Sequence, residues 1–236
     1  MRRVIVVGGT SGIGRAIAAR FAADGAQVLA TGASPAETRA ANESVESAGI
    51  AFDVLDVRDA AAVHDLMARQ ASLDVLVNCA GVIRRGEEHD PAVFQQVIDI
   101  NLNGSMRTCA AARPLLAATR GCIVNTASML SFFGGGLVPG YSASKGGIAQ
   151  LTKSLAIAYA VDWIRVNAVA PGWIATPLTA ALQNDPARSA PIVARTPLGR
   201  WGTPQDVANP VHFLASDAAR FVTGVVLPVD GGYLIC

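Results

Sequence analysis

Short apolar runs recur along the whole chain, with helix-length segments between them. The sequence contains seven such runs: Arg3–Val7, Gln27–Thr31, Ile50–Val54, Leu73–Asn78, Cys122–Thr126, Ile164–Val169 and Val225–Val229. They contain few alternating polar residues, which is typical of parallel strands buried on both faces. Strands that alternate with helices form a parallel sheet with helices on both sides, joined by right-handed crossovers. The sequence therefore predicts an α/β protein with a doubly wound parallel sheet of about seven strands.

The length of 236 residues suits one domain with a substantial core, and we expect residues 1–236 to form it. No apolar run approaches the roughly 20 residues of a membrane span. The run Val4–Val7 after the basic start is too short for a signal peptide. The net charge of +1, without any charged block, favours neither nucleic acid nor an anionic membrane as a partner. A small-molecule partner is therefore expected.

The four cysteines stand at positions 79, 109, 122 and 236. No pair has the spacing of a metal site, so no metal is expected. Three of them lie in apolar contexts typical of small core residues, whereas Cys236 is terminal. This usage fits the reducing cytosol, and a cytoplasmic protein is expected.

A glycine-rich turn follows the first apolar run. It reads Gly8-Gly9-Thr10-Ser11-Gly12-Ile13-Gly14, and an amphipathic helix pattern over residues 12–23 comes next. Glycines let the backbone approach a pyrophosphate, and a helix N-terminus supplies amide donors and the positive end of a dipole. The alternative is an ordinary tight turn between strand and helix. The strand before the turn and the helix after it favour a nucleotide site.

Tyr141 and Lys145 lie one helical turn apart if residues 141–160 form one helix. An ammonium near a phenol favours phenolate and lowers the Tyr pKa from its reference of about 10. Such a phenol can exchange a proton with an alcohol or carbonyl near neutral pH. Ser128 lies at the carboxyl end of a strand, which is the ligand side of an open α/β sheet. A Ser there can be a simple cap, but its partners Tyr141 and Lys145 favour catalysis.

Two asparagine positions leave alternatives open. Asn78-Cys79-Ala80-Gly81 ends the fourth run, either as an ordinary turn or as a small-residue edge along which a cofactor lies. Asn101 lies within a helical pattern, where an Asn side chain competes with the backbone for hydrogen bonds. It is either a satisfied core amide or a group that holds a water relaying protons to Lys145.

The region from Gly172 to Gly202 interrupts the alternation with four prolines and no clear strand. A segment inserted after the carboxyl end of a strand is placed to cover a substrate, so residues 173–204 are a candidate lid. This segment carries one acid, Asp185, and the basic residues Arg188, Arg195 and Arg200. Guanidinium groups recognise carboxylates through paired hydrogen bonds. The alternative is that these arginines, and Arg84 and Arg85 beside Glu87 and Glu88, cap helices or pair with acids.

Taken together, these features identify the chain as similar to the short-chain dehydrogenase/reductase family. The resemblance rests on Gly8-x3-Gly12-Ile-Gly14, Asn78-Cys-Ala-Gly81, Asn101, Ser128, Tyr141-x3-Lys145, Pro171-Gly172 and Asp230-Gly-Gly232, in order over the whole chain. It implies a Rossmann-type fold, NAD(P)-dependent oxidoreduction and a homotetramer. Val7 and Cys79 replace the Thr and the second Asn that the family carries there, which affects local hydrogen bonds rather than activity.

The resemblance also implies roles for individual residues. Tyr141 would be the acid/base, Ser128 would polarise the carbonyl, Asn101 would hold the relay water, and Lys145 would bind the ribose and lower the Tyr pKa. Asp56 would lie at the adenine and Thr176 at the nicotinamide amide. The residues expected at the cofactor are Gly8, Ser11, Gly12, Ile13, Gly14, Gly32, Asp56, Val57, Asn78, Ala80, Gly81, Tyr141, Lys145, Pro171, Gly172, Ile174 and Thr176. Those expected at the substrate are Arg84, Arg85 and Met129.

Three segments also resemble bacterial sugar-acid members of the family, the 2-deoxygluconate and 2-dehydro-3-deoxygluconate dehydrogenases. They are Ile83-Arg84-Arg85, residues 128–132 and residues 195–202. The expected activity is hydride transfer between nicotinamide and a small secondary alcohol or ketone, with a sugar acid as the first candidate. The alternatives are a 3-oxoacyl-carrier-protein reductase or general carbonyl reductase, and a non-catalytic dinucleotide sensor. The presence of both Tyr141 and Lys145 argues against a sensor.

The choice between NAD and NADP stays open. NAD-preferring family members carry an acid at the end of the second strand, where this chain has Gly32. No Arg stands beside Gly32 to attract a 2′-phosphate, and the residue before Gly12 is Ser11. If Gly32 lies at the ribose, a carboxylate placed there is expected to favour NAD.

Overall fold

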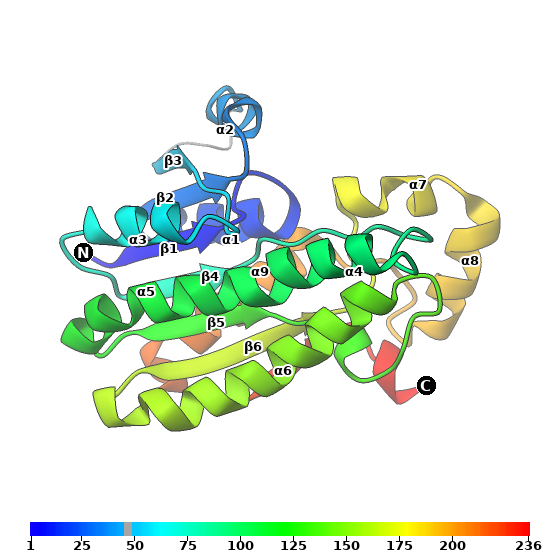
Figure 1. Cartoon of the computed structure of the whole chain (residues 1–236). Helices are drawn as coiled ribbons and strands as arrows, with labels where there is room; N and C mark the ends of the chain where they lie inside the picture. Colours follow the sequence, from blue (N-terminus) through cyan, green and yellow to red (C-terminus); the bar gives the residue numbers. More distant parts are fainter. Residues whose placement is uncertain (45–48) are drawn as a thin grey trace.

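The computed structural model describes residues 1–44 and 49–236, and its centre is one parallel sheet (Figure 1). The strand order is β3-β2-β1-β4-β5-β6-β7, and every neighbouring pair is parallel. The strands are β1 (Arg3–Val7), β2 (Gln27–Gly32), β3 (Ile50–Val54), β4 (Val75–Asn78), β5 (Cys122–Thr126), β6 (Arg165–Pro171) and β7 (Val226–Val229). The expected fold class is confirmed, as a seven-stranded Rossmann-like sheet.

The boundaries of four strands differ from the predicted runs. β2 continues to Gly32 and β7 begins at Val226, each a difference of one residue. The fourth strand begins at Val75 rather than Leu73, and the Asp74 carboxylate just before it accepts the backbone N–H of Arg3. The sixth strand continues to Pro171, which pairs with Val229 of the edge strand β7. Proline is tolerated at the end of a strand because the ladder no longer needs its N–H group.

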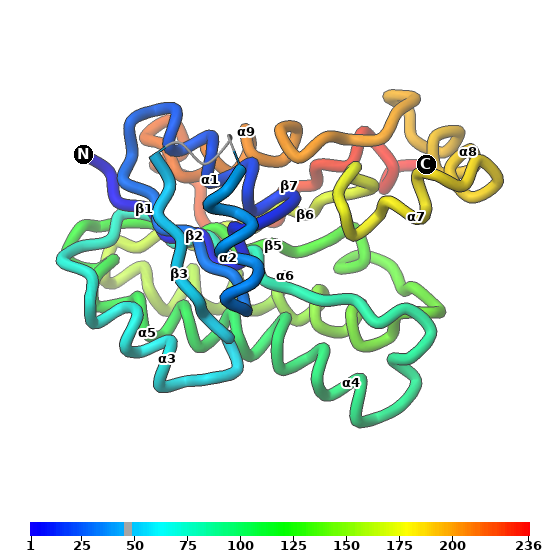
Figure 2. Tube along the Cα trace, turned by 90° about the horizontal axis from the view of Figure 1, so that it is seen from above, coloured from blue at the N-terminus to red at the C-terminus, as the bar shows by residue number. Residues whose placement is uncertain are grey.

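Helices cover both faces of the sheet (Figure 2). One face packs α1 (Gly12–Ala23) and α9 (Pro204–Ala215), and the other packs α3 (Ala60–Ala68), α5 (Gly104–Thr119) and α6 (Pro139–Tyr159). In β1, Val4 and Val6 belong to the first core and Ile5 and Val7 to the second. Successive residues of a strand point to opposite faces, so a strand covered on both sides must be apolar throughout.

The remaining helices are α2 (Pro35–Asn42), α4 (Pro91–Ile98), α7 (Ala180–Gln183) and α8 (Pro186–Arg195). The last two belong to the candidate lid and lie beyond one end of the sheet (Figure 1). Thr176 at the start of this segment lies against the glycine turn, since a Cβ on Gly12 would be 3.5 Å from the Thr176 Cβ. The segment therefore lies where the strands end. None of the helices in the described ranges has the length and apolar character needed to cross a membrane.

The turn after β1 is packed too tightly for side chains. Gly8 has a φ of +79°, and a Cβ there would be 2.5 Å from the backbone nitrogen of Ala80. A Cβ on Gly14 would overlap the carbonyl oxygen of Gly8. The absence of side chains thus lets the turn approach the end of β4 and lets α1 begin directly against it.

We expect Gly14→Ala to destabilise the protein by about 1–3 kcal/mol, because the new methyl group forces the turn to shift. Gly146 is the matched control. It lies inside α6, and a Cβ there would meet nothing within 4 Å. Gly146→Ala should instead stabilise the protein by about 0.5–1 kcal/mol. Urea unfolding of both variants measures the difference, and equal effects would contradict the tight packing at Gly14.

Candidate active site

Helix α6 carries Tyr141 and Lys145 on one face, as predicted. Pro139 occupies the first helical position, where its missing N–H costs nothing. The Lys145 Nζ lies 5.5 Å from the centre of the Tyr141 ring. It donates a hydrogen bond of 2.6 Å to the carbonyl oxygen of Thr126, the last residue of β5. The ammonium is therefore fixed against the carboxyl end of the sheet.

Ser128 follows the same strand and combines both roles considered for it. Its hydroxyl accepts the N–H of Leu130 and so caps the short helix Met129–Ser131. It also forms a hydrogen bond with the Tyr141 side chain. Met129 lies next to it and is buried. Ser128, Tyr141 and Lys145 are thus brought together from two elements.

Burial determines the protonation of this pair. Burial raises the pKa of Tyr141 to about 12, the Ser128 hydrogen bond lowers it in part, and the nearby Cys79 and Glu88 raise it further. Burial lowers the pKa of Lys145 to about 8. Burial is thus the main influence on the Tyr141 pKa in the protein, and it acts to raise that pKa. The lowering of the Tyr141 pKa by Lys145 stays a prediction.

Asn101 lies in a single turn of π-helix, Asp99–Asn103, between α4 and α5. Its amide exchanges hydrogen bonds with Val82, accepting from the N–H at 2.8 Å and donating to the C=O at 2.9 Å. It also donates to Ser144, whose hydroxyl donates to the Tyr141 carbonyl. A Cβ on Gly81 would be 3.3 Å from the Asn101 Oδ1 and 3.7 Å from the Lys145 Nζ. Asn101 is thus a satisfied buried amide that also borders the lysine.

Asn78 does not present its side chain to the glycine turn. Its amide donates to Asn125 and to the sulfur of Cys109, and it accepts a hydrogen bond from Thr108. All these groups are buried between the sheet and α5. Any contact of Asn78 with a cofactor would therefore have to come from its backbone.

Glu88 is a site residue that the sequence did not reveal. Its side chain is fully buried, and its two oxygens accept the backbone N–H groups of Arg84 at 2.8 Å and of Tyr141 at 2.7 Å. The second bond caps the first turn of α6, where a negative charge is favoured by the helix dipole. Glu88 was expected only as a counter-ion of Arg84 and Arg85, and that alternative is wrong because it binds backbone instead.

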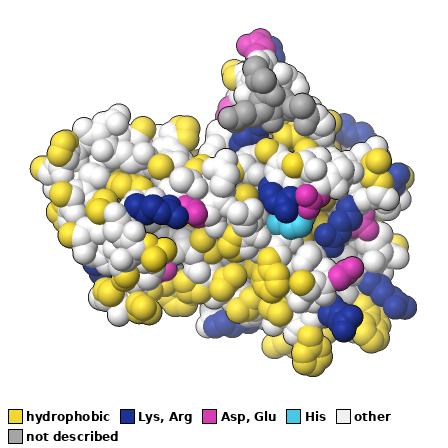
Figure 3. Space-filling model, turned by 180° about the vertical axis from the view of Figure 1, so that it is seen from behind, with side chains coloured by type: hydrophobic (Ala, Val, Ile, Leu, Met, Phe, Trp, Pro, Cys, Tyr) yellow, Lys and Arg dark blue, Asp and Glu magenta, His cyan; other side chains and the backbone are white. Residues whose placement is uncertain are grey.

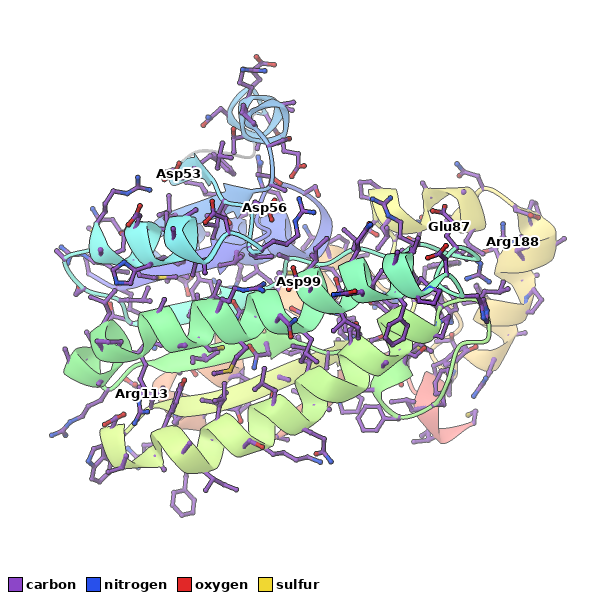
Figure 4. The ribbon with its side chains drawn as sticks, viewed as in Figure 1. Asp53, Asp56, Glu87, Asp99, Arg113 and Arg188 are labelled. Atoms are coloured by element: carbon purple, nitrogen blue, oxygen red, sulfur yellow. The ribbon has the colours of Figure 1, made fainter. Side chains whose placement is uncertain are left out.

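Two of the three arginines in the candidate lid, Arg195 and Arg200, contact other residues of the protein, and Arg188 is exposed. Arg200 forms hydrogen bonds of 2.7 and 3.0 Å to the two oxygens of Asp206. Arg195 lies 4.2 Å from the centre of the Tyr233 ring and donates to the Cys236 carbonyl. The structural alternative is thus correct for these two. Glu87 and Arg188 extend at the same end of the molecule (Figure 4), Glu87 from the loop before α4 and Arg188 from α8.

Arg84 and Arg85 are exposed, and within the described ranges their side chains form no ion pair. The loop that carries them is fixed at both ends of its turn. Glu88 holds the Arg84 backbone, and the Gly86 N–H donates to the Leu137 carbonyl at 2.8 Å. The two guanidinium groups therefore project from an anchored loop beside Tyr141.

The glycine turn has the properties of a dinucleotide cradle. Gly8 and Gly12 have positive φ values of 79° and 51°. Ser11, the N-cap of α1, makes no side-chain hydrogen bond, and the first turn of this helix contains no acid. Its N–H groups are therefore available to an anion. Ile13 packs against the core and Ala80 lies against Gly8, so the residues present fit a bound dinucleotide.

The end of β6 closes the other side of this cradle. Pro171 is the last residue of the strand, and a Cβ on Gly172 would be 2.6 Å from the Asp230 Cβ, so Gly172 permits the contact with the closing glycine segment. Ile174 is buried and bridges to Gly202. Thr176 caps the short helix Pro177–Thr179. Residues 171–176 thus run from the end of β6 to the glycine turn, and their contact with a cofactor stays a prediction.

The predicted adenine side consists of Gly32, Asp56 and Val57. Asp56 forms an ion pair with Arg58, which holds the pKa of its carboxyl below the usual range; Figure 4 shows it near Asp53. Val57 is buried against Gly104. At Gly32 a Cβ would be 2.7 Å from the Thr10 Cγ2 and 3.1 Å from the Glu37 Oε2. A carboxylate thus lies beside Gly32, which the sequence reading missed because it comes from α2.

This arrangement can be compared with known proteins. The family model described as enoyl-(acyl carrier protein) reductase matches residues 7–234. The chain belongs to the short-chain dehydrogenase/reductase family. It is 42% identical to a 2-dehydro-3-deoxy-D-gluconate 5-dehydrogenase of Pseudoalteromonas atlantica, over 98% of this chain and 94% of the relative. It is 43% identical to a cis-4-hydroxycyclohexanecarboxylate dehydrogenase of Sinomonas cyclohexanicum, over 98% and 96% of the two chains.

A similar solved structure is that of a putative NAD(P) dependent gluconate 5-dehydrogenase from Beutenbergia cavernae with bound NADP at low occupancy. Its TM-score is 0.92 at 42% identity, covering 100% of this chain and 97% of that one. This short-chain dehydrogenase/reductase is an NAD(P)-dependent oxidoreductase that transfers a hydride between nicotinamide and a small-molecule alcohol or ketone.

Glu88→Gln removes a charge that raises the pKa of Tyr141, so we expect that pKa to fall. The ascending limb of the pH profile of kcat/KM for alcohol oxidation, where Tyr141 loses its proton, should move to lower pH. Ser128→Ala removes the hydrogen bond that lowers the same pKa, so its limb should move to higher pH. Glu87→Gln, an exposed neighbour, is the control and should leave the limb in place. Shifts of the same sign in the first two variants would contradict the assignment.

Proposed function

We propose that this enzyme interconverts a small, carboxylate-bearing secondary alcohol and its ketone, with Tyr141 as the acid/base. The observation that carries the proposal is the contact of the half-buried Tyr141 with Ser128, beside Lys145, at the carboxyl end of the sheet. This is the ligand side of an open α/β sheet. All three groups converge on one place where a substrate oxygen can meet both hydroxyls.

In ketone reduction the Tyr141 phenol donates its proton to the substrate oxygen. The pKa of about 12 keeps the phenol protonated at neutral pH, which suits this role. The Ser128 hydroxyl donates a second hydrogen bond to the same oxygen and stabilises its developing charge. The nicotinamide, when bound, supplies or accepts the hydride at the substrate carbon.

Lys145 and Asn101 would help to move the proton that Tyr141 exchanges with the substrate to and from solvent. The pKa of about 8 lets Lys145 gain or lose a proton near neutral pH. In alcohol oxidation Tyr141 would first lose its phenol proton, which the lysine end of the site passes to solvent, and the phenolate would then take the hydroxyl proton of the substrate. Asn101 borders Lys145 across Gly81, the position at which a relay water would connect the lysine to solvent. Lys145 would also bind the nicotinamide ribose.

The proposed path of the dinucleotide follows the carboxyl ends of the strands. Its pyrophosphate would bind the turn at Gly8, Ser11, Gly12, Ile13 and Gly14. The adenine side would lie near Gly32, Asp56 and Val57, and the nicotinamide side near Ala80, Gly81, Pro171, Gly172, Ile174 and Thr176. Asn78 would contribute through its backbone. The cradle without side chains and the uncapped start of α1 support this path.

Arg84 and Arg85 would bind the substrate carboxylate. Both are exposed, and their loop is anchored next to Tyr141 through Glu88. The names of both relatives above denote carboxylate substrates. Met129 would form part of the wall beside Ser128. We propose that residues 1–236 act as one catalytic domain, over which residues 173–204 serve as the substrate lid.

We further propose that the enzyme is a homotetramer and that it acts in the cytosol. Ile157 near the end of α6, and Val161 and Trp163 just after it, are 80%, 76% and 71% exposed, which is high for large apolar side chains. Apolar side chains also gather on the face seen from behind (Figure 3). Phe213 in α9 and Phe221 after it are exposed as well. Two such faces fit contacts with two neighbours. The free cysteines fit a reducing compartment.

Tyr141→Phe should lower kcat by about 10²–10⁴-fold, the usual contribution of general acid–base catalysis. The ring is kept, so dinucleotide binding should be unchanged. Tyr159→Phe is the control, because Tyr159 lies in the same helix but in the core away from Ser128. Steady-state kinetics and binding of NADH or NADPH test the pair. Near wild-type turnover in Tyr141→Phe would refute the mechanism.

The substrate assignment predicts that a sugar acid is turned over better than the matching neutral sugar alcohol. Arg84→Ala or Arg85→Ala should lower kcat/KM for the acid by about 10–100-fold, in line with the loss of charge-assisted hydrogen bonds. Turnover of the neutral substrate should change little. Arg188→Ala on the exposed face of the lid is the control. Equal kcat/KM for charged and neutral substrates in the unmodified enzyme would favour a general carbonyl reductase.

A further inference from the structure

The end of β2 contains a carboxylate, although the strand itself ends in Gly32. Glu37 reaches this position from the first turn of α2. A Cβ placed on Gly32 would be 3.1 Å from both the Glu37 Cβ and the Glu37 Oε2. The Glu37 side chain therefore fills the space that a side chain at the end of the strand would occupy.

Local hydrogen bonds hold this carboxylate in place. Ser34 is the N-cap of α2, Pro35 follows at the first helical position, and the Ser34 hydroxyl accepts the Glu37 N–H. The Glu37 Oε2 accepts the backbone N–H of Ala33 at 3.1 Å, and the Oε1 accepts the Ser34 hydroxyl at 3.3 Å. The turn between β2 and α2 is thus folded around the Glu37 side chain.

The Glu37 carboxylate has more hydrogen-bond acceptor sites than its bonds to Ala33 and Ser34 use. An ionised carboxylate has about four lone-pair sites on its two oxygens. The hydrogen bonds in the structure use one on each oxygen. Glu37 is exposed, so the remaining sites face solvent at the edge of the proposed dinucleotide cradle. It can accept two further hydroxyl donors without giving up its present bonds.

We propose that Glu37 accepts hydrogen bonds from the hydroxyls of the adenine-side ribose and repels a 2′-phosphate, so that this enzyme selects NAD(H) over NADP(H). The inference rests on the proposed path of the dinucleotide past Gly32. A ribose diol matches the acceptor-only chemistry of a carboxylate. A 2′-phosphate would bring a charge of the same sign into contact with it, at a distance where repulsion is strong.

The cations of this region do not offset that charge. Arg58 is paired with Asp56. The Arg15 guanidinium lies 5.2 Å from the centre of the Phe52 ring and donates to the Ala41 carbonyl. Arg39 lies only two positions after Glu37 in the same helix, and residues two apart on a helix do not face each other. A phosphate at the ribose would therefore meet Glu37 first.

Binding of ligands without nicotinamide tests the proposal on the intact enzyme. Isothermal titration of AMP and of adenosine 2′,5′-bisphosphate compares a free ribose 2′-hydroxyl with a 2′-phosphate. We expect the unmodified enzyme to bind AMP at least about tenfold more tightly. Glu37→Gln should reduce that ratio by about tenfold or more, a difference of about 1.4 kcal/mol at 25 °C. NADH and NADPH, followed by their fluorescence, should show the same change.

Glu43→Gln is the matched control. It removes the same charge from the other end of α2, at the C-cap, and should leave both ratios unchanged. An unchanged ratio in Glu37→Gln overturns the proposal, as does an unmodified enzyme that binds the bisphosphate as tightly as AMP. The comparison of AMP with the bisphosphate on the unmodified enzyme needs no variant, so it tests the proposal even if Glu37→Gln unfolds. These are binding measurements, so an enzyme that prefers AMP but oxidises no carboxylate-bearing alcohol would contradict only the proposed function.

Discussion

The buried carboxylate of Glu88 is the contact on which the geometry of the site depends. It accepts one N–H from the loop that carries the arginines and one from Tyr141 itself. A buried carboxylate without partners is costly, so these two bonds must form together when the loop and α6 pack. The position of Tyr141 over the end of β5 and the position of Arg84 beside it are consequently set by a single side chain. Glu88 therefore links the loop of Arg84 to Tyr141, the proposed acid/base.

Desolvation then sets the chemistry that this geometry can perform. In water the phenol and the ammonium have similar pKa values, about 10 and 10.4. Burial moves them apart in opposite directions, to about 12 for Tyr141 and about 8 for Lys145, because each loses its charged form. The protein alone thus favours a neutral phenol beside a lysine that titrates near neutral pH. These pKa values suit the proposed role of Lys145 as the group that exchanges protons with solvent.

Local patterns predicted the sheet, the glycine turn and the three groups at residues 128, 141 and 145, because each depends on spacing along one strand or helix. What they missed depends on contacts between distant segments. The π-turn at Asn101 forms where two helices join, and no local pattern distinguishes it from a continuous helix. The role of Glu88 follows from a partner 53 positions away. The raised pKa of Tyr141 depends on how deeply the phenol is buried, which a sequence does not show.

The two carboxylates whose contacts the sequence did not predict, Glu88 and Glu37, show that burial decides which role a carboxylate can take. Glu88 and Glu37 both accept backbone N–H groups close to the start of a helix. Glu88 is 1% exposed and its oxygens are both engaged by the fold, so it can only position other residues. Glu37 is exposed and keeps free acceptor sites at the edge of the cradle. The same local chemistry therefore stabilises the helix of Tyr141 in one place and leaves a charge at the edge of the proposed cofactor cradle in the other.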